Sequence, residues 1–498
     1  MVDNEDYEVF DIDSDLHWLK RLPHYIKNIY LDELLDKGVI NEIHNEYTRI
    51  LFWKKLVKSE YVGVWGWNTW CGIHTFPILI GDNTAEIYKN TVEVGFARTE
   101  PGTNLLPHAV LHNNGIFGSK PTYKCYGGQH GETYNLGNML GWAKMAMEYV
   151  LYSNDLAWFD KPKLQIITDT INYILENFRE KYNPHLIYTG IEGDWTECTD
   201  WELDNANVNV NMLRTLELYI ECLKLFGMES TIQGYKGIRK KMREEFNKSV
   251  NEGGFWSEEC GHYIHGNDGT GANIHGDRYF ESTVNYFSVL WDVIPHDYEE
   301  LLWSYLTAYG DKIEFPYPVL TNYRPRTSAR RTNYGRTVTN GDVWLVLGAH
   351  ATAARLKSGF INRGSRMYKT IIEYEMEHGV FHNSLYQNGT VNDSWDPEVA
   401  NNGAPFPPLI YGVLGIKPLY EGIEFNIRAL SGLSCLKTDL FLFGKKHELK
   451  IKWNNNIVEK IVFKKIGTAA EEERKVDIDA CRFMVYREEP HEIIQFDN

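Results

Sequence analysis

The chain has 498 residues, of which 43% are hydrophobic and 14% aromatic, so it carries enough apolar side chains for a large folded core. Its formal net charge is −17 and its Lys and Arg residues are dispersed, which argues against a nucleic-acid partner. The N-terminal residues are acidic without an apolar run, and no stretch reaches the roughly 18 apolar residues of a membrane span. Seven widely spaced Cys residues without a CxxC pair are typical of reduced thiols. We therefore expect a cytoplasmic globular protein with no membrane partner and no cofactor.

Amphipathic stretches of helical periodicity alternate with polar, Gly-rich and aromatic-rich loops from Leu31 to Ile427. The stretches come in pairs, and short turns alternate with long segments rich in Trp, Asp, Glu, His and Asn. A ring of helical hairpins that carries its chemistry on one rim has this asymmetry. The predicted helices include residues 136–151, 163–182, 208–225, 235–250, 282–293, 298–309, 343–357 and 364–378.

The pattern changes near Leu436, where apolar and polar residues begin to alternate with a period of two. This alternation, interrupted by polar turns, indicates short strands. We predict two units. Residues 1–430 form a mainly α-helical toroid, and residues 431–498 form a small β-rich C-terminal subdomain.

Two polar clusters stand directly before predicted helices. The first, VWGWNTW, contains Trp65, Trp67 and Asn68, and a buried indole N–H needs a partner, which favours contact with sugar hydroxyls. The second, YGGQHGETY, contains Gln129 and His130, which can bind hydroxyl groups. The structural alternatives are core packing for the indoles and a helix-capping turn for the second cluster.

A third cluster, GIEGDWTECTDW, places four carboxylates within nine positions: Glu192, Asp194, Glu197 and Asp200. Mutual repulsion makes such a cluster costly unless a site uses it. An indole such as that of Trp195 raises the pKa of a neighbouring carboxyl toward that of a general acid, while a hydrogen-bonded neighbour stays ionised and holds substrate. A solvated acidic loop with helix caps is the alternative.

A late segment, NGTVNDSWDPEVANNGAPFPP, offers the second carboxylate that glycoside cleavage requires, from Asp393, Asp396 or Glu398. Its alternative is a turn-rich surface loop.

Two further candidate sites have weaker support in the sequence. His262, His265 and His275 lie in one polar segment, but their spacing matches no tight zinc geometry, so we expect a substrate loop and no metal. Asp342 precedes a predicted helix, where it either caps the helix or reaches the cleft.

Taken in order, the Trp-rich, acidic and late carboxylate segments resemble those of the six-hairpin glycosidase superfamily, which includes processing α-glucosidases, trehalases, glucoamylases, α-L-rhamnosidases and cellobiose phosphorylases. WGWNTW resembles the WGWD-type segment of the trehalase and processing-glucosidase group, with Asn68 where Asp is usual. GIKPLYEGIEF resembles the end of phosphorylase and rhamnosidase barrels. The resemblance extends to about Ile427 and implies an (α/α)6 toroid that acts on carbohydrate.

The resemblance leaves the proton donor open between two registers. DWTE is similar to the DWND of disaccharide phosphorylases and to the GDW region of rhamnosidases, which favours Glu197 over Asp194. TGIE is similar to the SGxD of trehalases and processing glucosidases, which would favour Glu192. EVANNGAPF resembles the segment of processing glucosidases and glucoamylases whose Glu activates water, which assigns Glu398 as the base, although Pro-Pro follows where Ser-Trp is usual.

The resulting prediction is an inverting, exo-acting glycoside hydrolase. Glu197 protonates the leaving oxygen, Glu398 deprotonates a water on the opposite face, and Asp194 binds sugar hydroxyls. Trp65, Trp67 and Trp195 would wall the pocket.

Three alternatives remain open at this stage. A phosphorylase would use phosphate in place of water and would need an anion site, for which Arg324–Arg336 is a candidate stretch. An epimerase or lyase would depend on His130 or His265. A non-catalytic sugar-binding protein would show no turnover. The sequence leaves the sugar, its anomer, the linkage and the oligomeric state undetermined.

Overall fold

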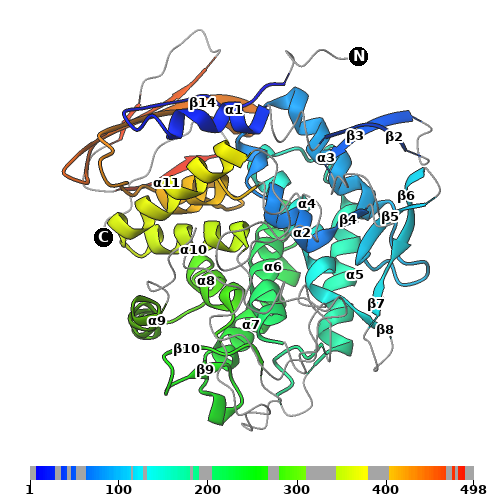
Figure 1. The fold of residues 1–498 in the computed structure, drawn as a ribbon. Coiled ribbons are helices and arrows are strands. Elements are labelled where there is room, and N and C mark those ends of the chain that lie inside the picture. The colour runs from blue at the N-terminus through cyan, green and yellow to red at the C-terminus, as the bar shows by residue number, and fades with distance from the viewer. Residues whose placement is uncertain are drawn as a thin grey trace.

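The structure is a computed structural model, and its helices form two concentric layers (Figure 1). No helix in the described ranges is long and apolar enough to cross a membrane. The described residues are 7–27, 35–41, 46–51, 63–113, 116–126, 132–179, 183–189, 205–266, 280–309, 344–378, 403–466, 474–476 and 481–487.

The inner layer consists of helices that are buried on every side. Every residue of α4 from Leu136 to Tyr152 is buried, as is every residue of α10 from Leu345 to Leu356. Each inner helix packs on the next, in the order α2, α4, α6, α8, α10 and the π-helical turn η8. The bounds are Gly66–Ile73 (α2), Leu136–Ser153 (α4), Ala206–Leu225 (α6), Ser282–Leu290 (α8), Leu345–Lys357 (α10) and Pro408–Val413 (η8).

The inner helices α2 to α10 are parallel, because their side-chain contacts run in step. Trp70 in the second half of α2 donates its indole N–H to Glu148 in the second half of α4. Glu148 in turn accepts a hydrogen bond from Arg214 of α6, and the Arg214 guanidinium lies 4.4 Å from the ring centre of Trp291 at the C-terminal end of α8. At the C-terminal ends, the Lys357 ammonium of α10 donates to the Leu290 carbonyl of α8. The N-terminal ends of these helices therefore share one end of the ring.

Two glycines allow α2 and α4 to cross closely. A Cβ atom on Gly66 would lie 1.9 Å from the carbonyl oxygen of Asn138, and one on Gly141 would lie 2.3 Å from the Gly66 carbonyl. Any side chain at either position would push the two backbones apart.

The outer layer consists of amphipathic helices that bury one face. In α5 the buried apolar residues are Leu164, Ile167, Ile171, Ile174 and Leu175, which follow helical spacing. Asp160 caps α5 by accepting a hydrogen bond from the Lys163 N–H. The outer helices are α1 (Leu22–Tyr25, after the 3-10 turn η2, Leu19–Arg21), α3 (Asp82–Phe96), α5 (Lys161–Asn177), α7 (Glu229–Phe246), α9 (His296–Tyr309) and α11 (Ile361–His378).

The eight helices predicted from periodicity are confirmed as α4 to α11, with some ends shifted. The helix predicted over 163–182 ends at Asn177, because Phe178 leaves the helical conformation. The helix predicted over 235–250 begins earlier, at Glu229, after a glycine with positive φ at position 227. A mainly α-helical toroid with C-terminal strands is the architecture that the sequence predicted.

The C-terminal strands form two small antiparallel sheets, and one of them includes a strand from the other end of the chain. The five-stranded sheet has the order β1-β13-β14-β15-β16, in which Ile12 of β1 pairs with Thr438 of β13. A three-stranded sheet has the order β11-β12-β17. The bounds are Ile12–Ser14 (β1), Lys417–Pro418 (β11), Gly422–Asn426 (β12), Cys435–Leu442 (β13), Lys445–Asn454 (β14), Ile457–Lys465 (β15), Arg474–Val476 (β16) and Arg482–Tyr486 (β17).

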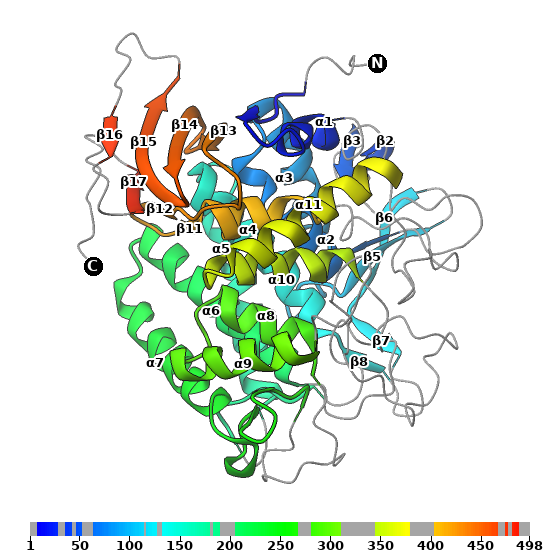
Figure 2. The same cartoon turned by 60° about the vertical axis from the view of Figure 1, so that its left-hand side comes forward.

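Further short strands occur where the sequence pattern predicted only helices and loops. Those between residues 35 and 134 lie on the other side of the molecule from the C-terminal sheet in both views (Figures 1 and 2). The Asn114-Gly115 pair between β5 and β6 is a typical hairpin signal that the prediction did not use. The short strands are β2 (Leu35–Asn41), β3 (Glu46–Leu51), β4 (Gly63–Trp65), β5 (Ala109–Asn113), β6 (Ile116–Thr122), β7 (Lys124–Tyr126) and β8 (Glu132–Tyr134); β9 (Trp256–Ser257) and β10 (His262–Tyr263) form a separate pair before α8.

Candidate active site

The segments predicted to carry the chemistry all lead into inner helices. The Trp-rich segment runs into α2, the Gln-His segment into α4, the acidic segment into α6, the His-rich segment into α8 and the Asp342 segment into α10. Since these helices are parallel, the residues at which the segments join them lie at one end of the ring, which we call the N-terminal rim. The late carboxylate segment precedes η8.

Most of the predicted site residues lie outside the described residues, and their roles stay predictions. This holds for Gln129, His130, Glu192, Asp194, Trp195, Glu197, Asp342 and Glu398, and for the side chain of Asn68. Trp65 and Trp67 are described. Trp65 is partly exposed at the position before α2, whereas Trp67 is fully buried in the hydrophobic core. The Trp67 backbone N–H donates to the Asn138 side chain, which ties the start of α2 to α4.

An asparagine in the first turn of α6 holds the chain that leads to the acidic segment. Asn209 accepts a hydrogen bond from the Ile187 N–H at 2.9 Å and donates to the Ile187 carbonyl at 2.8 Å. Its amide also donates to the Asn205 carbonyl at the start of α6. The buried Asn209 side chain thus holds both the N–H and the carbonyl of Ile187, which lies just before the acidic segment.

Helix α8 repeats this arrangement. Asn285 accepts from the Tyr263 N–H, donates to the Tyr263 carbonyl, and donates to the Glu281 carbonyl one turn back. Asn285 therefore holds the chain within the His-rich segment, between His262 and His265, as Asn209 holds the chain before the acidic one. We call these side-chain contacts of Asn209 and Asn285 amide clamps. They position two of the segments at the N-terminal rim in the same way.

Replacing Asn209 with Ala is expected to loosen the acidic segment. The change leaves the buried N–H and carbonyl of Ile187 without partners, which costs about 2–4 kcal/mol of folding free energy. Limited proteolysis with a glutamyl endopeptidase should cleave after Glu192, Glu197 or Glu202 faster than in the wild type. Asn285→Ala is the matched control: it should lower stability similarly without accelerating cleavage at those positions. Equal cleavage rates in both variants would contradict the clamp.

Below the N-terminal rim, polar side chains continue along the axis of the ring. The Asn211 amide donates to the Asn207 side chain, and its oxygen accepts a hydrogen bond from the Lys144 ammonium at 2.6 Å. The same ammonium lies 3.2 Å from the centre of the Trp70 ring, in cation–π geometry. Lys144 is fully buried, so these contacts are what offset the loss of its hydration.

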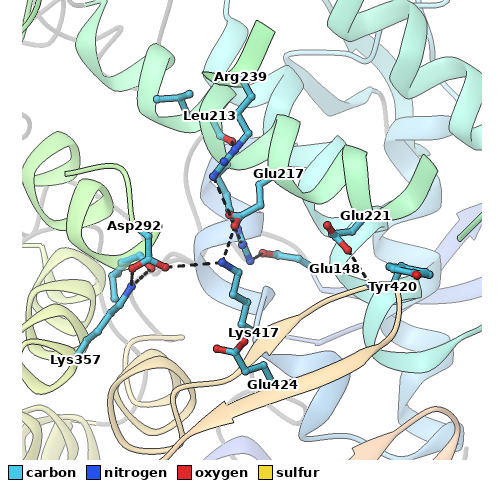
Figure 3. A network of polar contacts seen from close by, with 12 residues as sticks. Glu148, Leu213, Glu217, Glu221, Arg239, Asp292, Lys357, Lys417, Tyr420 and Glu424 are labelled. Atoms are coloured by element: carbon cyan, nitrogen blue, oxygen red, sulfur yellow. Dashed lines mark hydrogen bonds and ion pairs between the residues drawn. The ribbon is translucent and has the colours of Figure 1, made fainter. Parts of the chain in front are cut away.

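Toward the C-terminal ends of the inner helices, these polar contacts continue as ion pairs. Trp70 donates to Glu148, Glu148 pairs with Arg214 at 3.1 Å, and Arg214 also pairs with Glu217 at 3.1 Å. Lys417, the first residue of β11, reaches Glu217 at 2.8 Å (Figure 3). Lys144 and Arg214 thus balance Glu148 and Glu217 along the axis.

The charges of this axial network shift the pKa values of its members. Burial raises the pKa of Glu148, and its partners Arg214, Trp70 and Lys144 limit the rise. Burial also acts against the charged form of Glu217, but Lys417 and Arg214 outweigh it and lower its pKa to about 2. Glu217 therefore stays ionised at neutral pH.

Aromatic rings surround this network. His74 stacks on Trp70, His350 and Tyr411, with ring centres 4.8 to 5.4 Å apart. The Trp291 ring lies against the Arg214 guanidinium. Burial lowers the pKa of His350 to about 3 and that of His74 well below its ordinary value, so both imidazoles are neutral at physiological pH. Buried side chains therefore fill the axis of the ring below the N-terminal rim, and we call this filled region the floor.

The sequence prediction did not include this floor. Its signal was present, because Lys144 and Glu148 interrupt an otherwise apolar run at a spacing of four and so share one helix face. Their partners could not be read from the sequence, because Trp70, Asn211 and Arg214 come from two other helices. As for metals, no three His, Cys, Asp or Glu side chains gather into a metal site within the described ranges.

No protein-family model matches the sequence, and no curated protein matches it. Solved structures with a similar fold include two α-L-rhamnosidases. The enzyme from Dictyoglumus thermophilum has a TM-score of 0.57 at 11% identity, over 92% of this chain and 44% of its own. The enzyme from Aspergillus terreus has a TM-score of 0.57 at 12% identity, over 96% of this chain and 50% of its own. The chain thus spans half or less of the length of these two proteins.

A third similar structure is closer to this chain in size. The GH63 mannosylglycerate hydrolase from Thermus thermophilus, solved with glucose, has a TM-score of 0.50 at 10% identity. The match covers 71% of this chain and 94% of that one. Identities this low establish the architecture alone. The chain has the (α/α)6 toroidal fold of the six-hairpin glycosidases.

Proposed function

We propose that the protein is an inverting, exo-acting glycoside hydrolase whose active site lies at the N-terminal rim. The observation that supports this most strongly is the convergence of five candidate segments on the N-terminal ends of parallel inner helices. Below the N-terminal rim, described side chains fill the axis of the ring with aromatic rings and paired charges. The similar structures are named as glycoside hydrolases, which supports the same reaction class.

In the proposed mechanism, Glu197 protonates the glycosidic oxygen as the bond to the leaving group breaks. Glu398 removes a proton from a water that attacks the anomeric carbon from the opposite face, so the product has inverted configuration. Inversion requires the two carboxyl groups to stand about 6.5–9.5 Å apart, which leaves room for that water. Asp194 would hold sugar hydroxyls, and the partly exposed Trp65 would offer its ring to a sugar face.

A glycoside screen tests this proposal. The purified protein is incubated with nitrophenyl glycosides, including α-L-rhamnoside and α-D-glucoside, and with small disaccharides, each with and without inorganic phosphate. We expect hydrolysis of at least one exo substrate at a rate that does not depend on phosphate, with the inverted anomer appearing first in proton NMR spectra. Release of a sugar phosphate would instead identify a phosphorylase. A retained anomer would overturn the assignment of Glu398 as the base.

A further inference from the structure

A cavity of about 350 Å³ opens at the C-terminal ends of the inner helices, opposite the N-terminal rim. It lies between α6, α8, α10 and the chain from η8 to β12, and Arg482 of β17 closes one side. The described residues of its lining include five cations and three carboxylates, which together carry a net charge of +2. The whole chain carries −17, so this is a local reversal of sign. The cations are Arg214, Lys357, Lys417, Arg428 and Arg482.

The four cations other than Arg428 are all engaged with carboxylates of the lining. Arg214 pairs with Glu217 and Lys417 reaches Glu217 at 2.8 Å, so these two cations share one carboxylate. Arg482 pairs with Glu424 at 2.7 Å.

The fourth, Lys357, also has a capping role. Its ammonium lies 2.6 Å from Asp292 and donates to the carbonyls of Val289 and Leu290, at the C-terminal end of α8 (Figure 3). It thereby offsets the partial negative charge of that helix end, which would otherwise repel an anion.

Arg428 is different. Its guanidinium donates one hydrogen bond, to the Asn426 carbonyl at 2.8 Å, and it forms no ion pair with any described residue. It is only partly exposed, and burial lowers its pKa. Burial likewise lowers the pKa of Lys357 despite its pairing with Asp292. Partial burial of cations costs free energy when the nearby carboxylates do not balance their charge, and a bound anion would reduce that cost.

We propose that this cavity binds a phosphate group, held by the guanidinium of Arg428 and by Lys417, which lines the same cavity. A guanidinium presents parallel N–H groups that match two oxygens of a phosphate, and the cavity volume lies in the range of small-molecule sites. The phosphate belongs either to the free ion or to a small phosphate ester. The site is distinct from a phosphorolysis site, because it stands at the other end of the inner helices from the N-terminal rim.

The test measures the thermal midpoint of the wild-type protein while inorganic phosphate replaces chloride at constant ionic strength. A ligand that binds only the folded state raises the midpoint. We expect a saturable rise for the wild type and for Arg366→Gln, which removes an exposed arginine of α11. Arg428→Gln should bind phosphate about 10- to 100-fold more weakly, since a charge-assisted bidentate contact is lost. Isothermal titration calorimetry gives the affinities directly.

Further arms identify the source of the phosphate and separate this site from the active site. Tighter binding of glucose 6-phosphate than of inorganic phosphate identifies an ester, and equal or weaker binding identifies the free ion. Arg428→Lys keeps the positive charge but lacks the parallel N–H groups of the guanidinium, so it should bind phosphate with intermediate affinity. Glu197→Gln should bind phosphate like the wild type, so failure of the proposed catalysis would leave this result intact. An identical midpoint rise in Arg428→Gln and the wild type would overturn the proposal.

Discussion

Replacing Glu197 with Gln is expected to lower kcat for hydrolysis of a natural-type glycoside by roughly 10²–10⁴-fold, because the leaving oxygen loses its proton donor. The loss should depend on the leaving group. An alkyl or sugar alkoxide needs the proton, whereas a dinitrophenolate leaves readily without it. Steady-state kinetics on an alkyl glycoside and on the matching dinitrophenyl glycoside measure this difference.

The same experiment distinguishes the acid from its neighbours and from the base. Glu398→Gln should lower the rates of both substrates alike, since activation of water is needed whichever group leaves. Glu192→Gln and Asp194→Asn should act mainly through KM if these residues bind hydroxyls. A Glu192→Gln variant that shows the leaving-group dependence, together with an active Glu197→Gln variant, would reassign the acid to Glu192. Circular dichroism of each variant checks that the fold is unchanged.

Replacing Arg214 with Met is expected to lower the free energy of unfolding by about 3–5 kcal/mol. The side chain of Arg214 is 3% exposed and pairs with both Glu148 and Glu217. Its removal leaves Glu148, whose side chain is fully buried, without its cationic partner, and a buried uncompensated charge is costly. Denaturant unfolding, compared at equal slope, measures the loss.

A surface ion pair provides the matched control. Lys369 and Glu373 lie 3.6 Å apart on α11 with about half of each side chain exposed, so Lys369→Met should change stability by no more than about 0.5 kcal/mol. Adding Glu148→Gln to Arg214→Met should recover part of the loss, because the unpaired charge is then neutralised. If Arg214→Met behaves like Lys369→Met, the axial network does not contribute to stability as described.

The helices could be predicted from local sequence, because the apolar spacing and the capping residues that indicate a helix lie within its own segment. In α5, buried residues at helical spacing and the cap formed by Asp160 both depend on neighbours a few positions away. The sequence also predicted that long polar segments alternate with short turns. That alternation is the basis for placing the candidate site at the N-terminal rim.

The short strands and the N-terminal edge of the C-terminal sheet escaped prediction for a physical reason. β1 has three residues, and its pairing partner Thr438 stands more than 400 positions away in the chain, so no local pattern reveals the contact. The amide clamps are similar. The sequence shows Asn209 as one of several alternating asparagines, and only the fold brings it against the backbone of Ile187.

By itself, the sequence determined the helices, the presence of strands toward the C-terminus and the carboxylate-rich segments that an active site would need. Tertiary structure decided which ends of the helices meet, how Lys144 and Glu148 find partners on α2 and α6, and that Arg428 forms no ion pair with the residues described in the structure. The reason is that periodicity records which face of a helix is buried. Closure of the ring fixes what that face is buried against, and charged side chains from distant helices are balanced only there.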